Sequence, residues 1–154
     1  MDVKGKLAEF FMNRALTTLQ EAGAIEGVTW EDTDGKPDFI VTYRGQQLRL
    51  ECKNIRNEMF NNPPAYKVEL QRTRNGMDGT PTRGYKVSDF DVIGVSLFNQ
   101  TGRWDYAYIA ARNLERRPAM PDFLVVMQRV PIEIRDPWTG DPVLAFDDAL
   151  GRAR

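Results

Sequence analysis

The sequence contains no histidine, and this absence excludes much of the chemistry that small hydrolases use. Without histidine there is no Ser-His-Asp or Cys-His nucleophile, no histidine-ligated zinc and no nuclease with a histidine general base. The reactive groups that remain are carboxylates, lysine, tyrosine and arginine. Carboxylates are hard oxygen ligands, which favour Mg²⁺ or Mn²⁺ over zinc.

Cysteine is nearly absent, and long apolar runs are missing. The single cysteine, Cys52, cannot form an internal disulfide, which is typical of a reducing compartment. No stretch approaches the roughly 20 apolar residues that a membrane-spanning helix needs. The first residues, MDVKGKLAEFF, also lack the features of a secretory signal. We therefore expect a cytoplasmic protein with no membrane partner.

The chain also lacks a strong net charge. Its formal charge is −1, whereas many nucleic-acid-binding proteins are strongly basic. The charge is unevenly distributed, however, because seven basic residues stand against three acidic ones between Lys53 and Lys86. Solvated loop charges are one interpretation of this stretch, and contacts with nucleic-acid phosphates are the other. The candidates for phosphate contacts are Arg56, Lys67, Arg72, Arg74, Arg83 and Lys86.

The length of 154 residues suits a single domain, 1–154, with one core. Apolar residues recur at helical spacing over 7–22, and Gly23 is a suitable stop for that helix. Segments 39–43 and 47–52 predict two strands joined in a hairpin at Arg44-Gly45.

Turn residues and apolar patterns predict the remaining elements. In chain order these are a loop over 61–83 with one brief element at 66–72, a strand buried on both faces at 90–98, a turn at 99–102, a strand at 104–109, a helix or turn at 112–117, strands near 123–126 and 132–134, and a helix from Asp147. This order predicts an α/β fold with a central mixed β-sheet flanked by helices.

The second strand of the hairpin has one polar face. Successive side chains alternate, so Arg49, Glu51 and Lys53 share that face. With the turn at 44–45, Asp38 stands opposite Glu51, and their Cβ atoms would be about 4.5 to 5.5 Å apart. Both carboxylates could then ligate one divalent ion. A bulge in the turn would shift this register by one residue.

These residues match the needs of phosphodiester hydrolysis. The reaction requires a metal that polarises the phosphoryl oxygen and acidifies a bound water, with a cation or base beside the attacking oxygen. Asp38 and Glu51 could hold the metal. Lys53 could deprotonate the water or remain charged and stabilise developing negative charge, and the sequence leaves both roles open. The alternative is a solvated strand face with a surface ion pair.

Pro37-Asp38, followed by Glu51-Cys52-Lys53, resembles the motif of the PD-(D/E)XK nuclease superfamily, whose fold is restriction-endonuclease-like. The resemblance covers roughly residues 3–109. It implies that Asp38, Glu51 and the carbonyl of Cys52 bind Mg²⁺, for which Mn²⁺ could substitute. It also implies that Lys53 assists the attacking water.

Two further positions resemble features of this family. Glu9, in the first helix, matches an acidic residue that many members place beside the metal. Gln71 resembles a polar residue beyond the motif lysine. Both positions also fit an ordinary exposed side chain. A degenerate second motif, Pro121-Asp122 with Glu133-Ile134-Arg135, ends in an arginine, which cannot act as a base.

The expected function is therefore a magnesium-dependent endonuclease that hydrolyses DNA. DNA is preferred to RNA because of the family resemblance, and cleavage of both duplex strands by so small a domain would require a homodimer. Two alternatives remain open. One is a structure-selective nuclease of the junction-resolvase or repair type, and the other is a catalytically silent nucleic-acid-binding module of the same fold.

Overall fold

A five-stranded sheet forms the centre of the computed structural model, which describes residues 2–31, 33, 35–71 and 84–153. The β3 and β6 strands are parallel, and every other neighbouring pair in this sheet is antiparallel. The predicted central mixed sheet of an α/β fold is therefore confirmed. The strands are, in spatial order, β1 (Gly27–Trp30), β2 (Phe39–Tyr43), β3 (Gln46–Asn54), β6 (Val92–Ser96) and β7 (Tyr106–Ala110).

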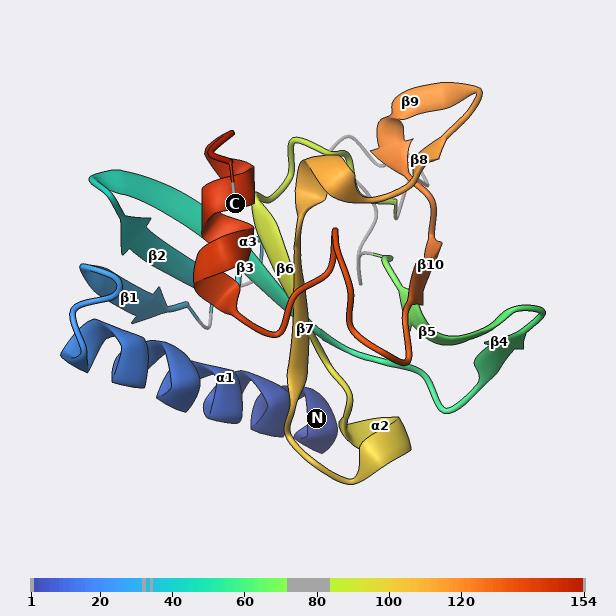
Figure 1. The fold of residues 1–154 in the computed structure, drawn as a ribbon, viewed down its shortest axis with the longest axis horizontal. Helices are drawn as coiled ribbons and strands as arrows, with labels where there is room; N and C mark the ends of the chain where they lie inside the picture. The colour runs from blue at the N-terminus through green and yellow to red at the C-terminus, as the bar shows by residue number, and fades with distance from the viewer. Residues whose placement is uncertain (1, 32, 34, 72–83, 154) are drawn as a thin grey trace.

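Two helices, α1 (Val3–Glu21) and α3 (Pro142–Ala149), pack on one face of the central sheet (Figure 1). The predicted first helix is confirmed. It approaches the middle of the sheet closely at Gly94, where a Cβ atom would lie 2.3 Å from Met12 Cε and 2.7 Å from the ring of Tyr108. Glycine is therefore required for this close packing. None of the described helices is long and apolar enough to cross a bilayer.

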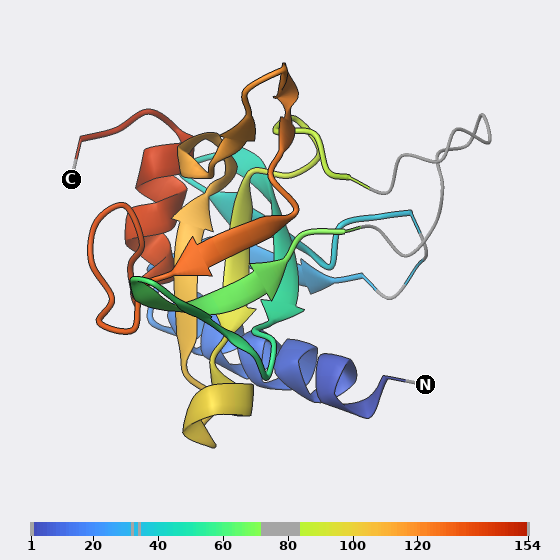
Figure 2. The same cartoon turned by 90° about the vertical axis from the view of Figure 1, so that its right-hand side faces the viewer.

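A smaller sheet covers the opposite face (Figure 2). Its strands are, in spatial order, β10 (Met127–Val130), β5 (Pro64–Glu69) and β4 (Met59–Asn61). Because both faces of the central sheet are covered, every residue of β6 is buried, as predicted for 90–98. The remaining elements are α2 (Phe98–Thr101), a 3₁₀ turn (Ala111–Asn113) and a hairpin of β8 (Arg116–Arg117) and β9 (Met120–Leu124).

The β2–β3 hairpin has the predicted register, with Phe39 opposite Leu50 and Val41 opposite Leu48. Both central turn residues have positive φ, 51° at Arg44 and 76° at Gly45. This is the type I′ geometry that matches the twist of a two-residue hairpin. The bulge that would have shifted the register is therefore not formed.

Other predictions were wrong. The β1 strand was not expected, and the β4–β5 hairpin occupies part of the predicted loop. The segment 132–134 alternates apolar and polar residues but forms no strand, and its Ile132 and Ile134 are exposed. The last helix begins at Pro142 rather than at Asp147, because Asp141 caps it by accepting a hydrogen bond from Val143 N at 2.9 Å.

Candidate active site

The polar face of β3 carries the predicted acidic residue and lysine. Leu50 and Cys52 point into the core beneath α1, while Glu51 and Lys53 point to the other face and are partly buried. Glu51 is paired with Ile93 of β6, and Lys53 is paired with Val95. The two functional candidates therefore lie in the middle of the sheet rather than on a solvated edge.

Asp38 lies directly before β2 and is held by main-chain groups on both sides. Its carbonyl accepts a hydrogen bond from Glu31 N at 2.8 Å, and its carboxylate Oδ2 accepts one from Cys52 N at 2.9 Å. A further hydrogen bond joins its side chain to that of Glu51. The end of the hairpin thus brings Asp38 and Glu51 together, as their register predicted.

The surroundings of Glu51 favour its protonated form. Burial, followed by the charge of Asp38 and the hydrogen bond with it, raises the pKa of Glu51 to about 8, while the charge of Lys53 acts in the opposite direction. Glu51 is therefore expected to keep its proton at neutral pH, since its ionised form would be repelled by the charge of Asp38. A cation between them would relieve that repulsion.

The oxygen atoms of this cluster fit Mg²⁺. Asp38 and Glu51 supply carboxylates, and the main-chain carbonyl of Cys52 is a third hard donor. Within the described ranges, no three acidic or cysteine side chains form a complete metal-binding group. Water and substrate oxygens would have to complete the coordination, as is usual for Mg²⁺.

Lys53 is held by a main-chain carbonyl and an aromatic ring. Its Nζ donates to the main-chain carbonyl of Gln71 at 3.4 Å and lies 5.6 Å from the ring centroid of Tyr85. No ion pair joins Lys53 to a carboxylate in the part of the chain that the structure describes. Gln71 therefore reaches the site through its main chain, whereas the prediction concerned its side chain.

Glu9 lies beside the cluster rather than in solvent. Its side chain is only 14% exposed, and its Oε1 accepts a hydrogen bond from Trp30 Nε1 at 3.0 Å. Its charge contributes to the raised pKa of Glu51 and of the Cys52 thiol. Burial is the main cause of the raised pKa of that thiol, so only the carbonyl of Cys52 is a candidate ligand.

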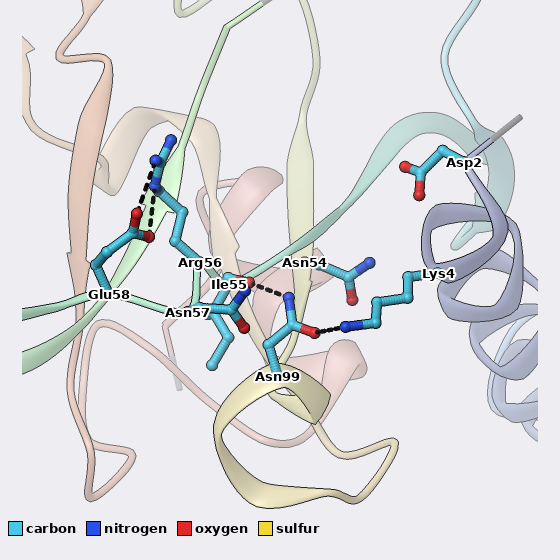
Figure 3. Close-up of a pocket in the computed structure, with 8 residues that line it drawn as sticks. All are labelled: Asp2, Lys4, Asn54, Ile55, Arg56, Asn57, Glu58 and Asn99. Atoms are coloured by element: carbon cyan, nitrogen blue, oxygen red, sulfur yellow. Dashed lines mark hydrogen bonds and ion pairs between the residues drawn. The ribbon is translucent and has the colours of Figure 1, made fainter.

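The strand that carries the site ends in a polar pocket of about 360 Å³ (Figure 3). Asn99 of α2 bridges its walls by accepting from Lys4 Nζ at 3.3 Å and donating to the carbonyl of Ile55 at 2.7 Å. These bonds tie the start of α1 and α2 to the chain just beyond β3. Among the described residues, Asn54 Oδ1 is buried here without a hydrogen-bond partner.

The predicted phosphate contacts fall into different groups. Arg56 is ion-paired with both Glu58 and Glu69, each at 3.1 Å, so its charge is already compensated. Lys67 instead lies 4.7 Å from the ring centroid of Phe60, and Lys86 lies 5.6 Å from that of Phe123. Arg72, Arg74 and Arg83 lie outside the described residues.

Two arginines with similar surroundings were missed. Arg129 Cζ lies 4.2 Å from the ring centroid of Phe60, and Arg117 Cζ lies 5.3 Å from that of Phe123. Each ring thus has a lysine and an arginine near it. No sequence pattern predicts the contact between Phe60 and Arg129, because the two residues are far apart in the chain and meet only when β4 and β10 join the same sheet.

Comparison with known proteins finds a similarity of fold. Neither a protein-family model nor a curated protein sequence matches the chain. The structure of the bacterial homing endonuclease I-Ssp6803I is similar to it, with a TM-score of 0.50 and 18% identity over 72% of this chain and 70% of that one. At this identity the similarity concerns the fold alone. The chain therefore shares the fold of a known endonuclease.

Proposed function

We propose that this protein is a magnesium-dependent endonuclease that hydrolyses phosphodiester bonds in DNA. The observation that carries the proposal is the contact of the Asp38 and Glu51 carboxyl groups, with the ammonium group of Lys53 on the same strand face. The fold shared with a homing endonuclease supports both the class of enzyme and the choice of DNA. The motif resemblance to PD-(D/E)XK nucleases supports the assignment of the individual residues.

Asp38, Glu51 and the carbonyl of Cys52 would hold Mg²⁺. When bound, the ion would polarise a phosphoryl oxygen and lower the pKa of a bound water. The chain itself prepares the ligands, since the Cys52 amide orients the carboxylate of Asp38 at 2.9 Å. The proton that Glu51 holds at neutral pH must leave when its carboxylate acts as a ligand.

Lys53 would act on the substrate rather than on the ligands. The Gln71 carbonyl and the Tyr85 ring hold its ammonium group without neutralising it. In this position it can stabilise negative charge on the phosphoryl group or exchange a proton with the attacking water. Glu9 would act through its neighbours, since it adds negative charge beside Glu51 and is itself held by Trp30.

Cleavage of supercoiled plasmid in the presence of Mg²⁺ or Mn²⁺ tests the proposal. We expect wild-type protein to nick or linearise the plasmid, EDTA to stop it, and Glu51→Ala and Lys53→Ala to lower the rate by roughly 10²- to 10⁴-fold. Glu21→Ala and Arg103→Ala are the matched controls, because both side chains lie away from the cluster. They should cut like wild type.

The outcomes separate the possible interpretations. Activity that survives in both site variants would contradict the assignment of the active site. Wild-type protein that cuts no form of DNA would contradict the proposed nuclease activity. Cleavage confined to branched DNA would instead indicate a structure-selective nuclease. We also propose a homodimer, since each copy has one site for two strands; a monomer on duplex DNA in sedimentation would contradict it.

A further inference from the structure

The β8–β9 hairpin projects from the body of the protein (Figures 1 and 2). Over 115–122 its residues are exposed, with the exception of Arg117, which is half-buried. An isolated two-stranded hairpin is only marginally stable in water. Its position away from the core therefore requires an anchor at its base.

Gln128 supplies that anchor. Its side chain is 3% exposed, and its Nε2 donates to the carbonyls of Glu115 at 2.8 Å and Val125 at 2.9 Å. Its Oε1 accepts from Glu115 N at 3.1 Å. The buried amide thus bonds to both sides of the hairpin base, which fixes the direction in which the hairpin points.

A short extended segment joins the hairpin to the candidate active site. Leu124 N donates to the carbonyl of Tyr85 at 2.9 Å, and Val87 N donates to that of Asp122 at 2.9 Å. The ring of Tyr85 is the one that lies against the ammonium group of Lys53. The neighbour of Tyr85 in the chain, Lys86, forms a bridge with Phe123 of β9. The hairpin is therefore physically continuous with the surroundings of Lys53.

Two cations lie at this junction against the ring of Phe123. Lys86 Nζ and Arg117 Cζ lie 5.6 Å and 5.3 Å from the ring centroid of Phe123, and Arg117 Nε donates to the carbonyl of Leu124 at 3.0 Å. Neither forms an ion pair with a carboxylate within the described ranges. An aromatic ring holds a cation in place but leaves its charge uncompensated. A phosphate group would compensate it.

We infer that the β8–β9 hairpin is a DNA-binding ribbon, and that Arg117 and Lys86 at its base hold a backbone phosphate of the substrate beside the site of cleavage. The inference rests on the proposed function, because it takes DNA as the ligand. The size of the element agrees with it, since the major groove of B-DNA admits a two-stranded ribbon.

Binding measured without cleavage tests this inference. Fluorescence anisotropy with a labelled 30-base-pair duplex, in a Glu51→Gln background, gives Kd as a function of salt. Arg117→Gln and Lys86→Gln should each weaken binding by about 3- to 10-fold and lower the slope of log K against log salt by about 1. Arg103→Gln is the matched control, because the Arg103 guanidinium is already paired with Asp105 at 2.9 Å. It should leave Kd and the slope unchanged.

Two further measurements separate binding from folding. Arg117 packs against Phe123, so thermal unfolding of each variant is followed, and Arg117→Lys should recover part of the affinity because it keeps the charge. The exposed Lys86 gives a second variant with little structural role. Unchanged Kd and salt slope in both glutamine variants would overturn the inference, as would an absence of DNA binding by the Glu51→Gln protein.

A failure of this inference can be distinguished from a failure of the proposed nuclease function. Weaker binding in these variants, combined with no cleavage by wild type, would support DNA binding by the hairpin and contradict the proposed nuclease activity. Cleavage by wild type with unchanged binding in the variants would overturn the ribbon alone.

Discussion

Basic side chains have different partners in two regions of this protein. Near α2 and α3 they are paired with carboxylates: Arg103 with Asp105 at 2.9 Å, and Arg152 with Asp147 at 3.4 Å. On the small sheet and around the β8–β9 hairpin, four of them lie against aromatic rings instead, although Arg56 is paired there with Glu69 of β5. The ring-bound cations of this region are these four, Lys67, Lys86, Arg117 and Arg129, and Lys53 of β3. On the helix side, Arg44 Cζ also lies 5.6 Å from the ring centroid of Tyr43, but Arg44 has Asp147 at 3.9 Å as well.

Stability does not distinguish the two regions. An exposed ion pair contributes about 0 to 1 kcal/mol, and a cation over an exposed ring contributes about as much. They differ instead in the charge that remains. The cations that are paired with carboxylates present little charge to an approaching anion, whereas the ring-bound cations of the small-sheet side keep theirs. Under the proposed function, the small-sheet side would therefore meet the substrate and the helix side would support the fold.

The largest effect on stability is expected from a substitution at Gly94, which lies beneath α1 on the helix side of the sheet. In Gly94→Ala the new Cβ atom would meet Met12 and the buried ring of Tyr108. The cost should be about 2 kcal/mol of unfolding free energy, or roughly 4 to 8 °C in Tm. Thermal and urea unfolding measure it. At low temperature, where the variant is folded, its DNA affinity should equal that of wild type. A loss of affinity without a loss of stability would indicate that the helix side of the sheet takes part in DNA binding.

A smaller effect on stability is expected from Glu51 in metal-free protein. Its folded pKa of about 8 is above the ordinary value of 4.5, so the native state binds the extra proton between these two values. Unfolding free energy should therefore fall as pH rises from about 4.5 to 8. Glu51→Gln removes this loss and should raise Tm in EDTA at pH 8.5 by several degrees.

The pH series contains its own controls. At pH 4 the wild type and Glu51→Gln should unfold alike, because Glu51 is then protonated in both states. Added Mg²⁺ should stabilise wild type at pH 8.5 more than the variant. A Tm difference that does not depend on pH would show that Glu51 has another role.

The smallest effect on stability is expected from a substitution at Gly84, which lies next to the ring-bound Arg117. A Cβ atom here would lie 2.3 Å from Arg117 Nη2, which is the end of a flexible side chain. Gly84→Ala should therefore change the unfolding free energy by less than about 0.5 kcal/mol. Displacement of the guanidinium should still weaken DNA binding by roughly 2- to 5-fold. A large loss of stability with unchanged Kd would contradict this prediction, because Gly84 would then behave as Gly94 is expected to behave.

The sequence predicted those parts of the fold that local patterns determine. The alternation along β3 and a two-residue turn were enough to place Asp38 opposite Glu51. Short strands such as β1 and β4 were not predicted, because they are specified by the strands they join. The contact of Lys53 with the Gln71 carbonyl could not be predicted either, because every residue has a main-chain carbonyl and residue type does not show which one accepts the hydrogen bond.

Trp30 gives this protein an intrinsic optical probe. Its indole Nε1 donates to Glu9 Oε1 at 3.0 Å, and its side chain is 37% exposed and stacked near Phe39. Indole emission responds to the charge and hydrogen bonding of its neighbours. Trp104, stacked on Phe98, and the buried Trp138 contribute a nearly constant background. Arrival of a divalent cation or of a DNA strand beside Glu9 should therefore change the fluorescence of the unlabelled protein in real time.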